Sequence, residues 1–408
     1  MTQVVWKDLA KDVGDLIKIS EEIDADISVH NEDPSAHGQT GEAIFSHRGN
    51  ATLDHINESV INAKIKYIVR GFNAVVDANL SEDTEGQYQD IQEAINYVHS
   101  LGGGKILVRT GTYYYTARDL VLYSNIDLIG EDDDNCIIDF GNSAYSCIAV
   151  GTAGTHLTNI NISGLQFYRC GDTTNGALKF DYVDNSSIVG NVFESNLNAA
   201  GDNGLSIKIL NSTHIKIRDN RILNGHYDID QSNVNYFYIE NNYFYSTNSI
   251  SITCTSLNNA VINKNYFNAV NNAIYAEENL HNSIIDGNII IDCESNGIGI
   301  TTSTKNRIVN NYIEGTTDSL RGIDIEDCNN EIISNNHIID FDDDGIEITT
   351  SDENIVNGNV INGNGAYGID ITNAQSDNNI VTSNIIKNNT SGSINDTGTG
   401  TISANNQT

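Results

Sequence analysis

Three carboxylates recur at a fixed interval in the second half of the sequence. Asp324, Glu347 and Asp370 each fill the third position of a Gly-Ile-x-Ile segment, and 23 residues separate each one from the next. A pair of carboxyl groups is the chemistry of glycoside cleavage, in which one protonates the leaving oxygen and the other acts as nucleophile or base. Like charges held close together also raise a pKa, as a general acid requires. We therefore take these three residues as candidate catalytic groups.

A second group of acids lies close to these segments in the sequence, and two other readings of the acids follow from it. Carboxylate oxygens are ligands of Ca²⁺, so this group is a candidate calcium site; no other cofactor is required. The chain also has 55 acidic and 21 basic residues, a formal charge of −34. Outward acids are therefore expected on a solvated face, where salt screens their repulsion. Catalysis, cation binding and a solvated face all remain open. The members of the second group are Glu326, Asp342, Asp343 and Asp344.

A repeated motif, aliphatic-x-x-Asn-x-apolar, must position these acids. Its nine asparagines follow one another at 29, 22, 23, 23, 23, 25, 23 and 25 residues. The Gly-Ile-x-Ile segments keep step with it at 297–300, 322–325, 345–348 and 368–371, with looser versions at 205–207 and 250–252. Two motifs in constant phase indicate a repeat architecture. The asparagines are Asn191, Asn220, Asn242, Asn265, Asn288, Asn311, Asn336, Asn359 and Asn384.

A period of about 23 residues with alternating strands indicates a coil of three short strands per turn. Alternation points both isoleucines of Gly-Ile-x-Ile inward and the third residue outward. Turns stack about 4.8 Å apart, so adjacent acids of the column would lie about 5 Å apart and those two turns apart about 10 Å. One asparagine per turn would occupy a bend and hydrogen-bond to its copies above and below, as a ladder. Ahead of the acids, the outward column reads Lys179, Ser206, Asp230, Ser251, Tyr275 and Gly299.

These patterns predict an all-β fold over residues 72–392. The fold is a right-handed, single-stranded parallel β-helix of about ten to twelve turns, roughly 50 Å long. Both ends of such a rod need caps, because each turn contacts only its neighbours. A capping helix near 88–100 is expected at the lower end, with Thr84 as its N-cap, and residues 393–408 would form a C-terminal cap or tail. The buried face of that helix would consist of Ile91, Ala94, Ile95 and Val98.

The first seventy residues carry separate signals. Apolar residues in 1–29 alternate at spacings of three and four, which predicts a short coiled coil of three heptads. An amphipathic helix that packs on its own chain is the alternative. The following region, 30–71, holds four histidines whose spacings match no zinc pattern, so structural or surface roles are expected for them. These histidines are His30, His37, His47 and His55.

Composition excludes several partners. A net charge of −34 repels nucleic acid and anionic membranes. No run of 18 apolar residues occurs, so membrane insertion is not expected. The opening MTQVVWKDLAKD has no secretory signal pattern. The six cysteines show no CxxC pairing, which predicts buried free thiols and synthesis in a reducing cytoplasm.

The segment that leads into the repeats resembles a known family. Asn73-Ala74-Val75, Ile91 to Ile95, Gly102 to Gly104, Gly111-Thr112-Tyr113 and Ile126 to Gly130 resemble the start of pectate-lyase-superfamily β-helices. Phage tailspikes and tail-associated polysaccharide depolymerases carry similar runs, and residues 30–71 are similar to N-terminal adaptor regions of phage tail proteins. The resemblance implies a β-helix and a homotrimer that other virion tail proteins hold through its N-terminal region. It does not imply one activity, because the superfamily includes lyases, hydrolases, epimerases and inert shafts.

The leading expectation is a virion-associated tail or spike protein, synthesised in the host cytoplasm, that contacts host-surface polysaccharide. If it is an enzyme, it is a hydrolase or lyase that uses the carboxylate column. One alternative is a non-catalytic structural or decorating shaft. A second is a free extracellular lyase or epimerase. Tyr227-Asp228-Ile229-Asp230 distantly resembles the Tyr-Gly-Phe-Asp-Pro-His stretch of alginate epimerases, but Gln231 and Ser232 replace its Pro and His.

Overall fold

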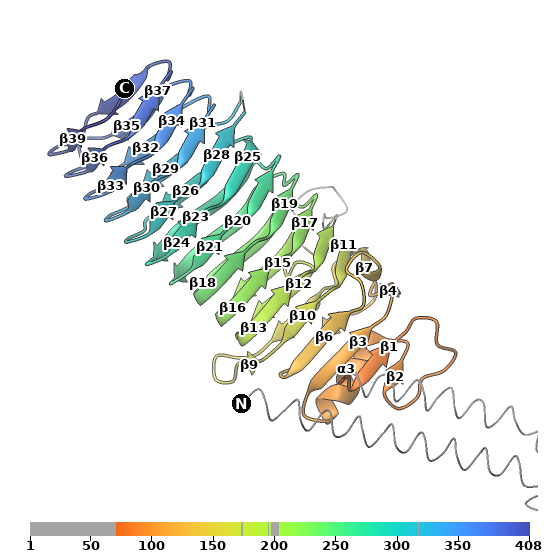
Figure 1. Ribbon diagram of the computed structural model, residues 1–408. Coiled ribbons are helices and arrows are strands. Elements are labelled where there is room, and N and C mark those ends of the chain that lie inside the picture. Colours follow the sequence, from red (N-terminus) through yellow and green to blue (C-terminus); the bar gives the residue numbers. More distant parts are fainter. Residues whose placement is uncertain (1–70, 173, 195, 197–203, 317) are drawn as a thin grey trace, which may run out of the picture. The chain divides into compact units, whose positions relative to one another are not determined.

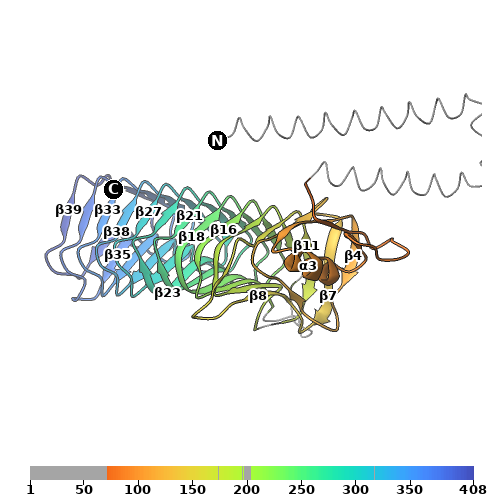
Figure 2. The same cartoon turned by 90° about the horizontal axis from the view of Figure 1, so that it is seen from below.

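The computed structural model describes residues 71–172, 174–194, 196, 204–316 and 318–408. The predicted N-terminal helix, the adaptor up to residue 70 and its four histidines lie outside the described residues. Ala74–Thr408 forms one compact unit. In Figures 1 and 2 this unit is an elongated coil in which successive turns stack along one axis. It has about 13 turns, so the predicted ten to twelve was slightly low.

Every turn contributes strands to three parallel files, which we call face 1, face 2 and face 3. All strand pairings between neighbouring turns are parallel. Face 1 holds β5 (Leu120–Val121), β8 (Cys147–Val150), β12 (Leu178–Asp181), β15 (Leu205–Leu210), β18 (Tyr227–Glu240), β20 (Ile250–Asn258), β23 (Asn272–His281), β26 (Ile298–Thr301), β29 (Ile323–Glu326), β32 (Ile346–Thr349), β35 (Tyr367–Thr372) and β38 (Gly392–Asp396).

Face 2 follows face 1 in each turn, and the long strands β18, β20 and β23 continue into it. It holds β1 (Ala74–Val76), β2 (Gln87–Tyr88), β3 (Gly104–Val108), β6 (Ile126–Gly130), β9 (Leu157–Thr158), β10 (Asn161–Ser163), β13 (Val183–Val189), β16 (Thr213–Arg218), β21 (Val261–Asn263), β24 (Ile284–Asp286), β27 (Arg307–Val309), β30 (Ile332–Ser334), β33 (Ile355–Asn357), β36 (Ile380–Thr382) and β39 (Ile402–Ala404).

Face 3 closes each turn and is a separate sheet of 12 strands. It holds β4 (Gly111–Tyr114), β7 (Cys136–Ser143), β11 (Gln166–Cys170), β14 (Val192–Glu194), β17 (Arg221–Leu223), β19 (Tyr243–Tyr245), β22 (Tyr266–Asn268), β25 (Ile289–Cys293), β28 (Tyr312–Gly315), β31 (His337–Ile339), β34 (Val360–Asn362) and β37 (Ile385–Lys387).

The interior is a continuous stack of apolar side chains from the three faces. Both isoleucines of every Gly-Ile-x-Ile segment are fully buried, as alternation predicted. In the three-residue strands of face 3 the middle residue also points inward, and equal residues stack there: the rings of Phe244 and Phe267 are parallel, with centroids 4.6 Å apart. All six cysteines are buried free thiols, as expected from their scatter.

The glycine of Gly-Ile-x-Ile is required by close packing. A Cβ on Gly322 would lie 2.3 Å from Cγ2 of Ile338 and 2.6 Å from the carbonyl oxygen of Gly345. The same clash would occur at Gly297, Gly345 and Gly368. These residues therefore let the bend before face 1 close tightly on the inward isoleucine of face 3.

The asparagines of the repeated motif stand in one file inside the bend that follows face 2. The Nδ2 of Asn288 donates to Oδ1 of Asn311 at 3.0 Å, and the same bond links every consecutive pair from Asn191 to Asn384. A tenth member, Asn406, accepts from Asn384 at 3.1 Å. Each Oδ1 also accepts a backbone N–H from the turn before it. In this bend the residue before each asparagine has positive φ, as at Asp219.

Both ends of the coil differ from expectation in detail. The capping helix α3 (Ile91–Ser100) buries the predicted face, but Asp90, not Thr84, caps it, because the Asp90 carboxylate accepts the backbone N–H groups of Gln92 and Glu93. At the other end, β38 and β39 pair in register with the preceding turn, so the coil continues beyond residue 392. In the described part of the chain α3 is the one α-helix, and no helix there is long and apolar enough to cross a membrane.

Candidate functional site

The fold brings the three candidate carboxylates onto adjacent strands of face 1. Asp324 on β29 lies opposite Glu347 on β32, and Glu347 lies opposite Asp370 on β35. All three point outward from between two buried isoleucines, and neighbouring strands are about 4.8 Å apart. The column therefore exists as a physical row; the catalytic role of its members remains a prediction.

The predicted members of the outward column were wrong at two positions below these acids. Lys208 and Thr253 occupy the outward positions of β15 and β20, because Ile207, Ile252 and Ile298 are the equivalent inward residues. Ser206 and Ser251, which were assigned to the column, are buried residues within β15 and β20. A shift of two residues preserves the alternation of a strand, so alternation alone could not exclude it.

One guanidinium holds the upper acids together. Arg321 lies in the bend before β29, where its Nη1 is 3.2 Å from Oδ2 of Asp324. Its Nε is 2.5 Å from Oε2 of Glu347 on the next turn, and 3.6 Å from Oδ2 of Asp343. Nδ2 of Asn296 also donates to Oδ2 of Asp324, at 3.4 Å. The charge of Arg321 is thus shared among three carboxylates.

On the other side of Glu347, Asp344 and Asp370 lie near Arg321 but make no ion pair with it, and three carboxylates gather there. Asp344, Glu347 and Asp370 each offer a carboxylate oxygen, and these oxygens all lie within 4.8 Å of one another. Asp344 is only 4% exposed, and its Oδ1 accepts the backbone N–H of Tyr367 at 2.7 Å. Oδ1 of Asp370 accepts from Nδ2 of Asn395 at 2.9 Å. Three oxygen ligands at this separation could hold a divalent cation.

Burial raises the pKa of every carboxyl group in this cluster. The pKa of Glu347 rises to about 7, chiefly by burial and further by the charges of Asp324, Asp344 and Asp370, against the opposing charge of Arg321. Burial first and then the charges of Asp343 and Asp370 raise the pKa of Asp344 to about 6. The pKa values of Asp324 and Asp370 are raised for the same leading reason. Glu347 can therefore keep its proton near neutral pH.

The four acids predicted to bind Ca²⁺ are placed differently from one another. Asp344 joins Glu347 and Asp370, whereas Asp343 pairs with Arg321. Glu326 is the next outward residue of β29 and is exposed, as is Asp342. In the described ranges, the other acidic group compact enough for a metal is Asp132 to Asp134. The predicted set is thus split, and only Asp344 stands with the catalytic candidates.

Two members of the site were not among the predicted residues, although a pattern marks them. Asn296, Arg321, Asp344 and Tyr367 each precede a Gly-Ile-x-Ile glycine, and their backbones pair from turn to turn. This bend column runs beside the outward acids. Arg321 and Asn296 could have been found by reading the residue before each glycine as a second column.

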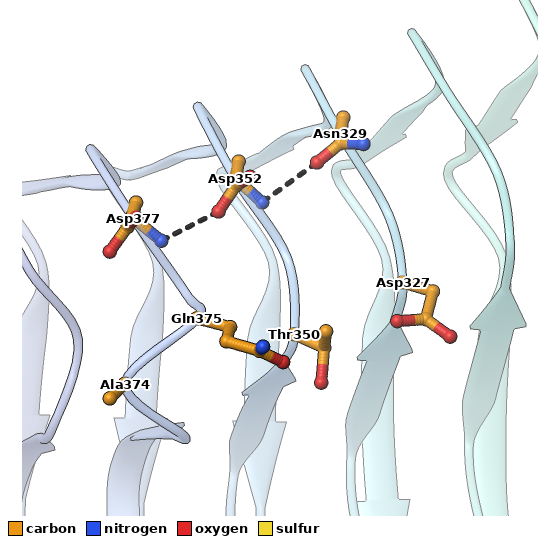
Figure 3. A pocket seen from close by; sticks show the side chains of 7 residues that line it. All are labelled: Asp327, Asn329, Thr350, Asp352, Ala374, Gln375 and Asp377. Atoms are coloured by element: carbon orange, nitrogen blue, oxygen red, sulfur yellow. Dashed lines mark hydrogen bonds between the residues drawn. The ribbon is translucent and has the colours of Figure 1, made fainter.

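A shallow polar hollow of about 440 Å³ opens on the same three turns, at the bend between face 1 and face 2 (Figure 3). Oδ1 of Asn329 accepts the backbone N–H of Asp352 at 2.9 Å, and Oδ1 of Asp352 accepts that of Asp377 at 2.7 Å. Figure 3 also shows the side chains of Asp327 and Gln375 beside this row. The hollow begins three residues after the acid column, since Asp327 follows Asp324 along the chain. Its lining offers hydrogen-bond acceptors and an amide.

The tetrapeptide 227–230 divides between interior and exterior. Asp228 is fully buried, the hydroxyl of Thr247 donates to it, and burial raises its pKa to about 8. Asp230 points outward, 3.4 Å from Nζ of Lys208. The carboxyl at 228 therefore belongs to the interior, where a substrate does not reach it.

Comparisons with known proteins agree with this architecture. The sequence model described as right handed beta helix region matches residues 198–323 and 282–408, which together are more than half of the chain. Tailspike protein 3 of bacteriophage CBA120 is similar in structure, with a TM-score of 0.59, 13% identity, and coverage of 82% of this chain and 61% of that one. No curated protein sequence matches the chain.

Two carbohydrate-active proteins have similar folds. The A-module of the Azotobacter vinelandii mannuronan C-5 epimerase AlgE6 gives a TM-score of 0.53 at 18% identity, covering 77% of this chain and 94% of that one. The catalytic domain of a GH87 alpha-1,3-glucanase gives 0.54 at 13% identity, covering 81% and 69%. At such identities these likenesses describe the fold. The chain belongs to the right-handed β-helix family.

Proposed function

We propose that this chain is a virion-associated, tail-spike-type β-helix protein that contacts host-surface polysaccharide. The site that cleaves the polysaccharide would be formed by Asp324, Glu347 and Asp370. The observation that carries the proposal is the position of Glu347: its pKa is about 7, and it stands between two other outward carboxylates on adjacent turns. Tailspikes, an epimerase and a glucanase among the structural neighbours support a polysaccharide ligand.

Glu347 is assigned as the general acid. It would donate its proton to the glycosidic oxygen as the bond to the sugar carbon breaks. Asp324 is assigned as the nucleophile: burial raises its pKa, and Arg321 and Asn296 oppose that rise because both bind its carboxylate. These two residues lie on neighbouring strands, about 5 Å apart, which suits a retaining mechanism. Water would then hydrolyse the glycosyl-enzyme, with Glu347 taking back a proton.

The polar hollow on the same turns supplies a place for the rest of the polysaccharide. Asp327, Asp352 and Gln375 present oxygen and amide groups to solvent there, and sugar hydroxyl groups are good partners for both. Attachment to other tail proteins through residues 1–71, assembly as a homotrimer and location in the virion are further parts of the proposal. They rest on the heptad spacing and on the resemblance of residues 30–71 to tail adaptors.

The test is to incubate the purified chain with capsule or exopolysaccharide from candidate hosts. Reducing ends measure hydrolysis, and ultraviolet absorbance of unsaturated products measures elimination. Asp324→Asn and Glu347→Gln should each abolish the new reducing ends, whereas Asp286→Asn, an outward acid of face 2, should not. Unsaturated products would assign a lyase instead. Tight binding of a glycan without turnover would favour the non-catalytic shaft.

A further inference from the structure

The outer side of face 3 carries a row of apolar side chains that the proposed function does not use. The eight strands β17, β19, β22, β25, β28, β31, β34 and β37 have two outward positions each, the first and the third residue. Of these 16 positions, 10 hold aliphatic or aromatic residues and only one holds a carboxylate. We call these 16 positions the apolar strip. Tyr245, Ile289 and Ile385 are 41%, 43% and 39% exposed.

The strip is nearly free of net charge on a strongly acidic chain. Its one carboxylate, Glu314, accepts a hydrogen bond from the hydroxyl of Tyr312 at 2.8 Å. Arg221 and Lys387 lie at its two ends. The upper turns instead present Asp324, Glu347 and Asp370 on face 1. The same turns thus carry acids on one side and an uncharged row on another.

The dimensions of the strip fit the centre of a protein interface. Eight strands about 4.8 Å apart give a length of roughly 34 Å, and three residues give a width of about 10 Å. A stable interface buries about 800 Å² on each partner, with an apolar centre and a polar rim. A flat row of roughly 340 Å² is a suitable centre, and residues beside it would form the rim.

A glycan is a poor match for this row. The flat faces of Tyr243 and Tyr266 lie against each other, with centroids 5.4 Å apart and planes 10° apart, so they are not free to stack on sugars. The aliphatic residues Ile289, Ile291 and Ile339 offer no hydrogen bond to a hydroxyl group. A straight and regular row with little net charge is instead matched by an equal row on another rod.

We propose that the apolar strip is the surface through which copies of this chain associate, with their rods side by side and parallel. Two chains of charge −34 repel each other. This repulsion is weakest when the strips, which carry little net charge, meet and the acids of face 1 point away from the axis. Burial of the exposed tyrosine and isoleucine side chains drives the contact. The number of copies in the assembly, three, is taken from the proposed function, whereas the choice of surface does not depend on it.

The test uses the full-length chain and single cysteines, because the six native thiols are buried. Ile289→Cys should give a disulfide-linked band of twice the chain mass under mild oxidation, since equal residues of parallel rods meet at the axis. Ile402→Cys is the matched control: Ile402 is 58% exposed but lies on face 2. No cross-link at position 289, or equal cross-linking at both positions, would overturn the proposal.

A second measurement asks whether the strip stabilises the assembly. Light scattering should give a multiple of 44.5 kDa for the wild type. Ile289→Lys with Ile385→Lys should raise the dissociation constant at least about tenfold, with an unchanged circular dichroism spectrum, whereas Ile402→Lys should not. A monomeric wild type at micromolar concentration would refute the association, and loss of glycan cleavage with intact cross-linking would refute only the proposed function.

Discussion

Face 1 and face 3 are sides of the same turns, yet their outward residues have opposite character. Inward, both present isoleucine or phenylalanine at equal positions, because every turn must fill the same interior. Outward, face 1 carries Asp324, Glu347 and Asp370, whereas the apolar strip of face 3 holds aliphatic or aromatic residues at 10 of its 16 positions. The interior is thus set by packing, and the exterior is free to differ by face. Function in such a rod is therefore to be sought in columns, one face at a time.

The largest expected effect is on glycan cleavage, which should depend on the acids of face 1 and not on the acid of face 3. Glu347→Gln removes the proton donor and should lower the rate of glycan cleavage about 10²- to 10⁴-fold. Wild-type activity should also fall as the pH rises above about 7, because Glu347 then loses its proton. Glu314→Gln, the acid of face 3, should leave the rate unchanged. Equal loss in both variants would show that the faces do not differ as proposed.

The next effect contrasts an interior and an exterior asparagine on neighbouring turns. Asn288→Ala deletes a carboxamide whose Oδ1 accepts from Asn265 and whose Nδ2 donates to Ile262 and Asn311. Several buried polar groups would lose partners, so urea unfolding should show a loss of about 3–5 kcal/mol. Asn268→Ala, on the outside of face 3, should cost less than about 0.5 kcal/mol. A loss below about 1 kcal/mol at position 288 would mean that water replaces the bonds.

A buried acid gives a pH-dependent test of the interior. In the bend between face 1 and face 2, Glu331 lies between Asn306 and Asn354 of the neighbouring turns: its carboxylate accepts from Asn306, and its backbone N–H donates to Asn354. Burial raises its pKa to about 7. Below about pH 4.5 both the folded and the unfolded chain keep this proton. Between about 4.5 and 7 only the unfolded chain releases it, so folded stability falls as the pH rises.

Glu331→Gln should remove that loss, which is on the order of 3 kcal/mol above pH 7. The measurement is the difference in free energy of unfolding between variant and wild type at pH 4 and pH 8, with exposed Glu353→Gln as the control. A difference that does not grow with pH would show that Glu331 is ionised in the fold.

The smallest expected effect concerns cation binding by face 1. Ca²⁺ at ten times its dissociation constant should stabilise the folded chain by about 1.4 kcal/mol, seen as a higher melting temperature. Asp344→Asn should abolish the rise, because Asp344, Glu347 and Asp370 supply the oxygens. If Asp133→Asn abolishes it instead, the ion binds at Asp132 to Asp134 and face 1 holds none.

Much of the fold could be predicted from the sequence because each turn repeats one packing problem. The glycine at 322 and the isoleucines beside it cannot be exchanged without a clash or a cavity, so they recur visibly. The last ladder member, Asn406, was missed because Ser403 and Thr408 replace the apolar residues that frame the other copies. In the strand register Ser206 and Ser251 occupy the position of that glycine, so the motif could be misaligned there by two residues.

The site was predicted less completely, because its contacts join side chains of the bends to side chains of the strands, and these do not belong to one repeated column. The outward acids share a column, and the period alone gives their order. Arg321 and Asp344 reach the same carboxylates from a neighbouring bend, and only coordinates show how far a side chain extends. The sequence did not reveal the apolar strip, because the alignment of Tyr243 with Ile289 and Ile385 appears only when face 3 is read in register.

The asparagine file also bears on how long such a rod can be. Each carboxamide accepts a hydrogen bond from the asparagine of the turn before and donates one to the asparagine of the turn after, in the same geometry. Any turn from Asn220 to Asn384 could therefore follow any other. Removing or duplicating one unit of 23 residues, such as 266–288, would leave every bond re-formed across the splice. The length of the rod can therefore change in increments of about 4.8 Å, while the residues at its two ends stay the same.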